Sequence, residues 1–193
     1  MDAPADDMAA LRTSIMSGDL EPLHRYLASG GDPDSVNTKG MSLLMLAVWA
    51  DKGPDGPRLL LEAGADISFC QPGTGWRAFH FAVVNDHLDV LHLLLHRGDA
   101  FHAPDDWKAL HYAVQYRAYR TLSALVERGV DIELRDDEGR TPLMRAARTG
   151  IPQMITFLIE SGADPYARDS DDRSPYDHAV HAGKKKAAML LRI

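Results

Sequence analysis

The chain has 193 residues, of which 45% are hydrophobic and 25% charged, a composition that favours one soluble domain and excludes disorder throughout. Its formal net charge is -7, and the excess lies in the first half: residues 1–96 carry 13 acidic against 6 basic side chains, whereas residues 97–193 carry 15 of each. Because such a surface repels a phosphate backbone, we expect a basic protein as the partner and not a nucleic acid.

Localisation follows from what the sequence does not contain. No apolar run approaches the roughly 20 residues that a membrane-spanning helix needs. The acidic start, residues 1–7, has neither the basic nor the apolar stretch of a secretion signal. A single cysteine, Cys70, excludes an internal disulfide. We therefore expect a cytoplasmic protein that does not contact a membrane and is stabilised by apolar burial.

The chain repeats itself about every 33 residues. One series of glycines is spaced by 33, 34, 31 and 33 residues, and a series of alanines by 35, 31, 33 and 33. The glycines are Gly31, Gly64, Gly98, Gly129 and Gly162, and the alanines are Ala47, Ala82, Ala113, Ala146 and Ala179. Two series in one register predict a repeat architecture in which neighbouring units bury a shared core.

Within each repeat, the sequence predicts two short helices and a turn. In the fifth unit, Thr141 is expected to cap a helix that has Pro142 at its first position and ends at Gly150. A second helix begins at Pro152 and carries one apolar stripe up to Gly162, where the left-handed conformation closes it.

These residues carry a family resemblance. The segment 139–165 resembles an ankyrin repeat, and His80 and His111 stand where that family has the histidine of its TPLH motif. The resemblance implies an all-α, ankyrin-repeat solenoid of stacked helix-turn-helix units with β-turn fingers, forming a single domain over 1–193. Its expected units are about 8–36 as the N-terminal cap, 37–69, 70–102, 103–135, 136–168, and 169–193 as the C-terminal cap.

Two segments depart from the family pattern. Residues 51–57 hold two glycines and two prolines between the helices of the second unit, which predicts a shortened helix and a longer loop. The finger of the third unit, residues 70–76, is also long.

The resemblance implies a partner-binding surface on the concave side, formed by the fingers and the exposed positions of each first helix. All three tryptophans fall on it by register, and exposed aromatic side chains are frequent binding anchors. A structural alternative is that Trp76 and Trp107 pack against adjacent fingers. The predicted partner-binding residues are Met41, Trp49, Trp76, Asp105, Trp107, Gln115, Tyr116, Asp137, Glu138, Arg140, Arg148 and Arg173.

Arg145 is unusual because hydrophobic or ring-bearing residues occupy the matching positions of the other units. An arginine there requires a carboxylate, supplied either by a neighbouring finger or by a ligand. We favour an internal salt bridge.

The sequence gives little support for a catalytic site or a metal site. His92 and His96 are spaced to share a metal ion, but no third ligand accompanies them. His80 and His111 have a structural place in the repeat, where the imidazole ties the finger to the helix. Cys70 has no evident base that would activate it. We therefore expect a protein that is not an enzyme and has no metal or cofactor.

The sequence thus predicts a protein-binding module, monomeric when unbound, that binds and inhibits a specific basic partner. A bacterial immunity protein or antitoxin that neutralises a toxin is the leading hypothesis. A general ankyrin adaptor or scaffold is the alternative, and a metal-dependent hydrolase is the least favoured.

Overall fold

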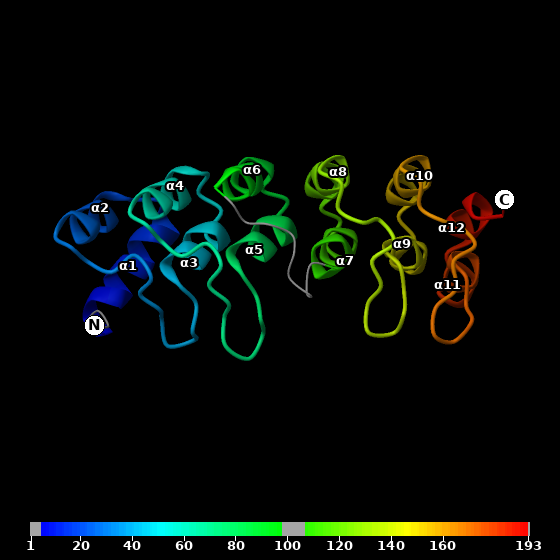
Figure 1. Ribbon diagram of the computed structural model, residues 1–193, viewed down its shortest axis with the longest axis horizontal. Helices are drawn as coiled ribbons and strands as arrows, with labels where there is room; N and C mark the ends of the chain where they lie inside the picture. The colour runs from blue at the N-terminus through cyan, green and yellow to red at the C-terminus, as the bar shows by residue number, and fades with distance from the viewer. Residues whose placement is uncertain (1–4, 98–106, 193) are drawn as a thin grey trace. The chain divides into compact units, whose positions relative to one another are not determined.

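The computed structural model describes residues 5–97 and 107–192, with side chains for 8–97 and 109–192 (Figure 1). Its residues group into two compact units, 1–100 and 101–193. Within the described residues, the regular secondary structure is helical, accompanied by an isolated β-bridge between Val36 and Ser42. The predicted all-α solenoid is therefore confirmed, while the single domain over 1–193 stays a prediction.

The first unit contains three helix pairs. Each pair packs together, and the first helices α1, α3 and α5 pack in series, so that they form one layer and α2, α4 and α6 the other (Figure 1). The helices are α1 (Ala5–Ser17), α2 (Glu21–Ala28), α3 (Leu43–Trp49), α4 (Asp55–Glu62), α5 (Ala78–Val84) and α6 (Leu88–His96).

The second unit repeats this arrangement, with α9 packed between α7 and α11. Its helices are α7 (Trp107–Gln115), α8 (Tyr119–Glu127), α9 (Pro142–Thr149), α10 (Pro152–Glu160), α11 (Pro175–His181) and α12 (Lys185–Leu190).

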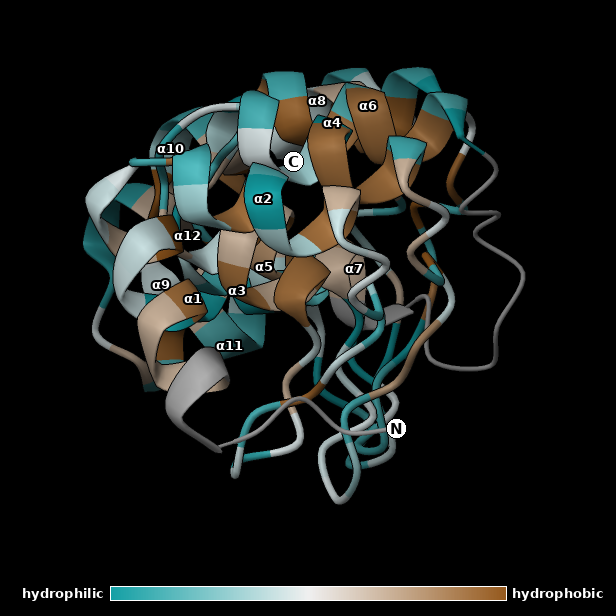
Figure 2. Ribbon diagram, turned by 90° about the vertical axis from the view of Figure 1, so that its left-hand side faces the viewer, coloured by the Kyte–Doolittle hydropathy of each residue, from teal (hydrophilic) through white to brown (hydrophobic). Residues whose placement is uncertain are grey.

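Apolar side chains at equivalent positions of the second helices supply much of the core in each unit. Leu60 and Leu94 in the first unit, and Leu125 and Leu158 in the second, have 0% of their surface exposed. Figure 2 shows the hydrophobic residues mostly on the helices. Since one helix pair cannot cover its own apolar face, each pair depends on its neighbours within the unit.

Three of the first helices begin with a side-chain cap, and the cap predicted at Thr141 is confirmed. The side chains of Ser42, Thr141 and Ser174 accept hydrogen bonds from the backbone N–H three residues later, at 3.3, 3.3 and 3.2 Å. These caps satisfy amide groups that have no partner inside the helix. At the start of α5 the bond runs the other way, because His80 Nδ1 accepts from the N–H of Arg77, three residues earlier, at 2.9 Å.

The turn that joins the two helices of a repeat contains a residue in the left-handed conformation. Gly150 has φ 73° there, whereas Asp51, Asp86 and Arg117 adopt φ values of 55°, 56° and 60°. The connection between α3 and α4 spans residues 50–54, compared with 85–87 between α5 and α6. The longer loop predicted from the irregular segment 51–57 is therefore confirmed.

Candidate partner-binding groove

The fingers at the start of the second, fifth and sixth repeats close by the same hydrogen bonds. Oδ1 of Asn37, Asp136 or Asp169 accepts from the backbone N–H groups two and four residues later, at 2.8–3.1 Å. The N–H of each of these residues also donates to the carbonyl four residues later. The fingers are thus rigid loops held in the same conformation.

In the second unit, the finger carboxylate also binds the helix beside it. Asp136 Oδ2 lies 3.0 Å from Nη2 of Arg145 on α9, and Asp169 Oδ2 lies 2.7 Å from Nε2 of His178 on α11. The carboxylate-bearing side chains are almost fully buried, with 3% of each exposed. The internal salt bridge expected for Arg145 is confirmed.

Arg145 connects this finger to a second helix. Its Nε donates to Nδ1 of His111 at 3.1 Å, and its Nη1 donates to Oε1 of Gln115 at 2.7 Å. On the other side of the ring, His111 Nε2 lies 3.0 Å from the carbonyl oxygen of Leu134. Since Nδ1 accepts, Nε2 carries the proton and donates to this carbonyl. The structural role expected for His80 and His111 is therefore confirmed.

The network sets the charge states of its members. Burial is the main cause that lowers the pKa of His111 from 6.5 to about 4, which keeps the ring neutral. Burial alone would raise the pKa of Asp136, but hydrogen bonds from Arg140 and Arg145 outweigh it and lower this pKa to about 2. Asp136 is therefore ionised in the folded protein at neutral pH.

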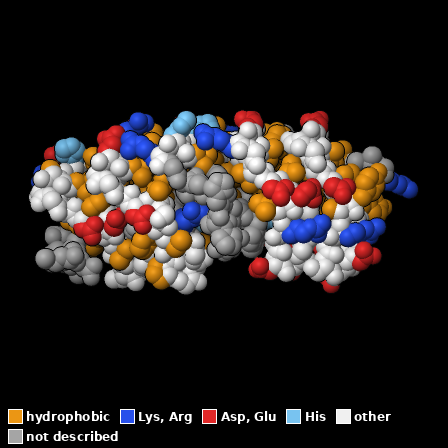
Figure 3. All heavy atoms as spheres, viewed as in Figure 1, with side chains coloured by type: hydrophobic (Ala, Val, Ile, Leu, Met, Phe, Trp, Pro, Cys, Tyr) orange, Lys and Arg blue, Asp and Glu red, His pale blue; other side chains and the backbone are white. Residues whose placement is uncertain are grey.

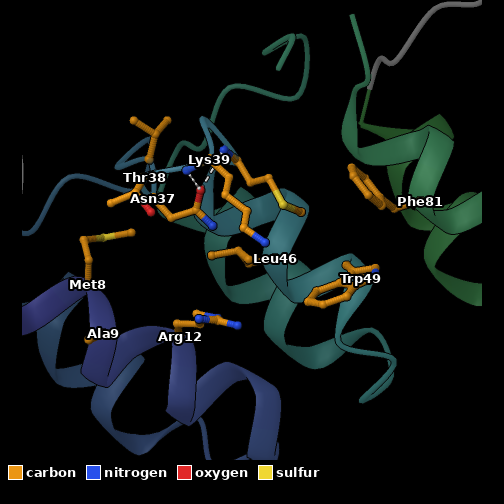
Figure 4. Close-up of a pocket in the computed structure, with 11 residues that line it drawn as sticks. Met8, Ala9, Arg12, Asn37, Thr38, Lys39, Leu46, Trp49 and Phe81 are labelled. Atoms are coloured by element: carbon orange, nitrogen blue, oxygen red, sulfur yellow. Dashed lines mark hydrogen bonds between the residues drawn. The ribbon is translucent and has the colours of Figure 1, made fainter. Parts of the chain in front are cut away.

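The first unit has a pocket where the second unit has this ion pair. Asn37 stands at the finger position of Asp136, and Leu46 on α3 stands at the helix position of Arg145. Between α1, α3, α5 and the finger 36–42 lies an apolar pocket of about 570 Å³ (Figure 4). It is lined by Met8, Ala9, Arg12, Val36, Asn37, Thr38, Lys39, Met41, Leu46, Trp49 and Phe81, and we call it the finger pocket.

Two predicted binding residues belong to the finger pocket. Trp49 is 43% exposed at the end of α3, and Met41 is half-buried in the finger. Trp76 is half-buried instead, with its ring stacked on His80 at 5.7 Å and in edge contact with Phe81 at 4.9 Å. These ring contacts are with α5, the helix that follows its own finger, and a role of Trp76 in partner binding stays a prediction. Asp105 and the side chain of Trp107 lie outside the described residues.

The polar groups of three predicted binding residues of the second unit interact with other residues of the same unit. Arg140 binds Asp136 at 2.8 Å, Arg173 lies 3.8 Å from Asp169, and Gln115 accepts from Arg145. Figure 3 shows acidic and basic side chains side by side over this unit. These residues hold the fold, and a role in partner binding stays a prediction for them.

The remaining predicted residues of the second unit are exposed. Tyr116 is 48% exposed and lies edge-on to Tyr112 at 6.3 Å. Arg148 and Asp137 are also exposed, and the exposed Glu138 pairs with Arg140. They are accessible to a partner without being gathered around a described pocket.

Other chemistry has little geometric basis in the described residues. Nowhere in 8–97 and 109–192 do three His, Cys, Asp or Glu side chains gather closely enough to hold a metal ion. Cys70 is an exposed thiol. Among the described helices, none combines the length and the apolar character needed to cross a membrane.

The comparisons with known proteins agree with this architecture. The family model for ankyrin repeats in three copies matches residues 8–105, 50–136, 79–169 and 110–192. The chain therefore belongs to the ankyrin repeat family. Over 99 residues it is 29% identical to cyclin-dependent kinase 4 inhibitor B of Rattus norvegicus, which covers 51% of this chain and 75% of that protein.

Among solved structures of other proteins, at least two resemble nearly the whole chain. The ankyrin repeat domain of Bcl-3, an IκB protein family member, has 28% identity and a TM-score of 0.80, over 94% of this chain and 83% of that one. A chain of the complex between the predatory endopeptidase Bd0816 of Bdellovibrio bacteriovorus and the immunity protein Bd3460 has 26% identity and a TM-score of 0.83. This match covers 99% of our chain and 98% of that one.

Sequence reasoning missed most of the finger pocket, including Arg12, Lys39 and Leu46. Aligning the fingers would have pointed to it, because Asn37 replaces an aspartate and Leu46 replaces a charged or ring-bearing residue at matching positions. Arg12 had no such signal, since the first repeat, residues 8–36, lacks a recognisable TPLH motif.

Proposed function

We propose that this protein binds one specific partner protein through the first unit and inhibits it, as an immunity protein does. The observation that carries the proposal is the similarity to the endopeptidase–immunity protein complex, which covers 99% of this chain and 98% of the matched one. A match over both full lengths aligns the whole array, including both of its ends.

The surface of the first unit suits this role. The finger pocket is apolar and open, and Trp49 stands exposed at its edge as a large anchor. Buried aromatic anchors dominate the energy of many protein interfaces. Inhibition by occupancy then requires that the surface of the partner held here includes its active site. The module itself needs no metal or cofactor for this.

Charge supports a basic partner. Residues 1–100 carry 14 acidic against 7 basic side chains. An acidic surface accelerates the encounter with a basic partner and restricts its orientation. We propose a hydrolase with a basic surface as the target, and a monomeric, cytoplasmic inhibitor as the unbound state.

Affinity capture from the native host tests the proposal. We expect the wild-type protein to retain one partner at 1:1 stoichiometry, with a Kd of about 1 nM or tighter and loss of the partner's enzymatic activity. Trp49→Ala should weaken binding by about 2 kcal/mol with little change in stability. Tyr119→Ala, which removes a comparably exposed ring from α8 in the second unit, is the matched control.

The result also separates the inhibitor from a general adaptor. Several partners bound at about micromolar Kd, each with its activity retained, would favour the adaptor. Equal loss of binding in the Trp49 and Tyr119 variants would show that the first unit has no special role.

A further inference from the structure

We propose that the finger pocket binds an acidic, apolar segment of the partner: an apolar side chain enters the pocket, and a neighbouring Asp or Glu carboxylate binds Arg12 and Lys39. This inference rests on the proposed function for the existence of a partner. It adds the chemistry that the pocket selects.

The apolar part of the site is preformed. Leu46 and Met8 contribute buried side chains with 1% and 9% exposed, and the Trp49 ring lies at the edge. The volume of about 570 Å³ falls within the range of about 300–1,000 Å³ that is typical of ligand pockets. Filling such a pocket with an apolar side chain removes both surfaces from water, which is favourable.

The charge of the lining is opposite to that of the unit. Among the described residues that line the finger pocket, the charged ones are Arg12 and Lys39, although carboxylates outnumber cations by 14 to 7 in residues 1–100. Both side chains are exposed, and neither forms an ion pair within the described residues. In contrast, Arg25 and Arg97 of the same unit each pair with a glutamate.

Lys39 is held in place by its backbone. Its N–H donates to Asn37 Oδ1 at 2.8 Å, and its carbonyl accepts from Gln71 Nε2 of the next finger at 2.9 Å. Figure 4 shows the Lys39 side chain directed from the finger toward Leu46, with Arg12 across the pocket on α1. A carboxylate between them would receive two charge-assisted hydrogen bonds, which are stronger than those between neutral groups.

The shape of the pocket favours a segment within the partner chain over a chain end. Its lining residues come from three successive helix pairs, from Met8 on α1 to Phe81 on α5. The site therefore extends along the array, as suits an extended segment that crosses it. A basic partner surface and one acidic segment are compatible, because the pocket inverts the charge only locally.

Selection of peptides from a random 12-residue library on phage, against the full-length protein, tests this chemistry. We expect enriched peptides to share an aromatic or aliphatic residue next to Asp or Glu. For the best peptide, synthesised and measured by fluorescence anisotropy, Arg12→Glu with Lys39→Glu should weaken binding at least about tenfold.

Lys52→Glu with Arg58→Glu is the matched control, because it makes the same change in charge at two exposed residues of the first unit outside the pocket. This control should change the affinity less than about threefold, by screened long-range effects alone. Circular dichroism should show unchanged helix content in both variants.

Enrichment of basic peptides, no enrichment at all, or equal effects of the two charge reversals would overturn the inference. The outcome is separable from that of the proposed function. Suppose that a partner is captured and inhibited but binds the Arg12 and Lys39 variant as tightly as it binds the control variant. The proposed chemistry of the pocket would then be wrong, while the inhibitor role would still hold. Selected acidic peptides without any inhibited partner give the reverse result.

Discussion

In the second unit, a buried aspartate of the finger binds a basic side chain of the neighbouring helix, whereas in the first unit the same two positions hold Asn37 and Leu46. The finger hydrogen bonds are alike in both, at 2.8–3.1 Å. What differs is the space beneath the finger, filled by an ion pair in one unit and open as an apolar pocket in the other. A closed finger therefore does not need the ion pair.

The charges of the two units follow the same division. Residues 1–100 carry 14 acidic against 7 basic side chains, and residues 101–193 carry 14 of each. Several charged residues of the second unit form internal ion pairs. The first unit has an acidic excess, and Arg12 and Lys39 at its pocket form no ion pair with the part of the chain that the structure describes. In the second unit, polar side chains thus stabilise the fingers and helices, whereas in the first unit the two pocket cations are exposed.

The largest expected effect comes from removing the buried carboxylate. Asp136→Ala removes the buried carboxylate that binds both Arg140 and Arg145, whose side chains are only 13% and 12% exposed. We expect the free energy of unfolding to fall by roughly 3–5 kcal/mol in urea denaturation. Asp137→Ala changes the exposed neighbour and should cost less than about 0.5 kcal/mol. Equal costs would remove the contrast between the units.

Leucines at equivalent positions allow both cores to be weakened in the same way. Leu94→Ala on α6 and Leu158→Ala on α10 each leave a cavity at a side chain that is 0% exposed. Each should lower the free energy of unfolding by about 2–5 kcal/mol. Val180→Ala, at a side chain that is 50% exposed, serves as the control with a small effect. If either leucine variant lost no more stability than Val180→Ala, the apolar stripe of the second helices would not be the core of that unit.

The fold was largely predictable because its information is local and repeated. The cap at Thr141, the turn at Gly150 and the internal salt bridge of Arg145 follow from residues whose register the repeats establish. The finger pocket was predictable only in part. The repeat register shows that Asn37 and Leu46 replace the residues of an ion pair, but Arg12 comes from α1, where no repeat motif gives the register. The half-buried ring of Trp76 depends on the path of a long finger, which register alone does not give.

A third effect concerns pH. Because the folded protein keeps His111 neutral down to a pKa of about 4, against 6.5 when unfolded, the unfolded state binds more protons between these values. The contribution of His111 to stability is therefore fully present above pH 6.5 and is lost as the pH falls toward 4. We expect a loss of about 2 kcal/mol between pH 7 and pH 5 from this residue.

Comparing the pH dependence of the wild type with that of His111→Gln isolates this contribution. The variant should show a shallower decrease in the free energy of unfolding over the same range, whatever its stability at pH 7. The lower pKa of Asp136, about 2, adds a further loss below pH 4, because its carboxylate must then be protonated. Identical slopes for the two proteins above pH 5 would show that His111 is not held neutral.

The smallest expected effect is an increase in the free energy of unfolding. Arg117 occupies the turn between α7 and α8 with φ 60°, at the position where Gly150 follows α9 with φ 73°. A left-handed conformation strains a residue that has a Cβ atom, so Arg117→Gly should raise the free energy of unfolding by about 0.5–1 kcal/mol, after the entropic cost of a glycine in the unfolded chain. Asp86→Gly makes the same change in the first unit at φ 56° and should gain less, because aspartate tolerates this conformation better than arginine does. A melting temperature that falls in the Arg117 variant would mean that its side chain contributes more through contacts than its backbone costs.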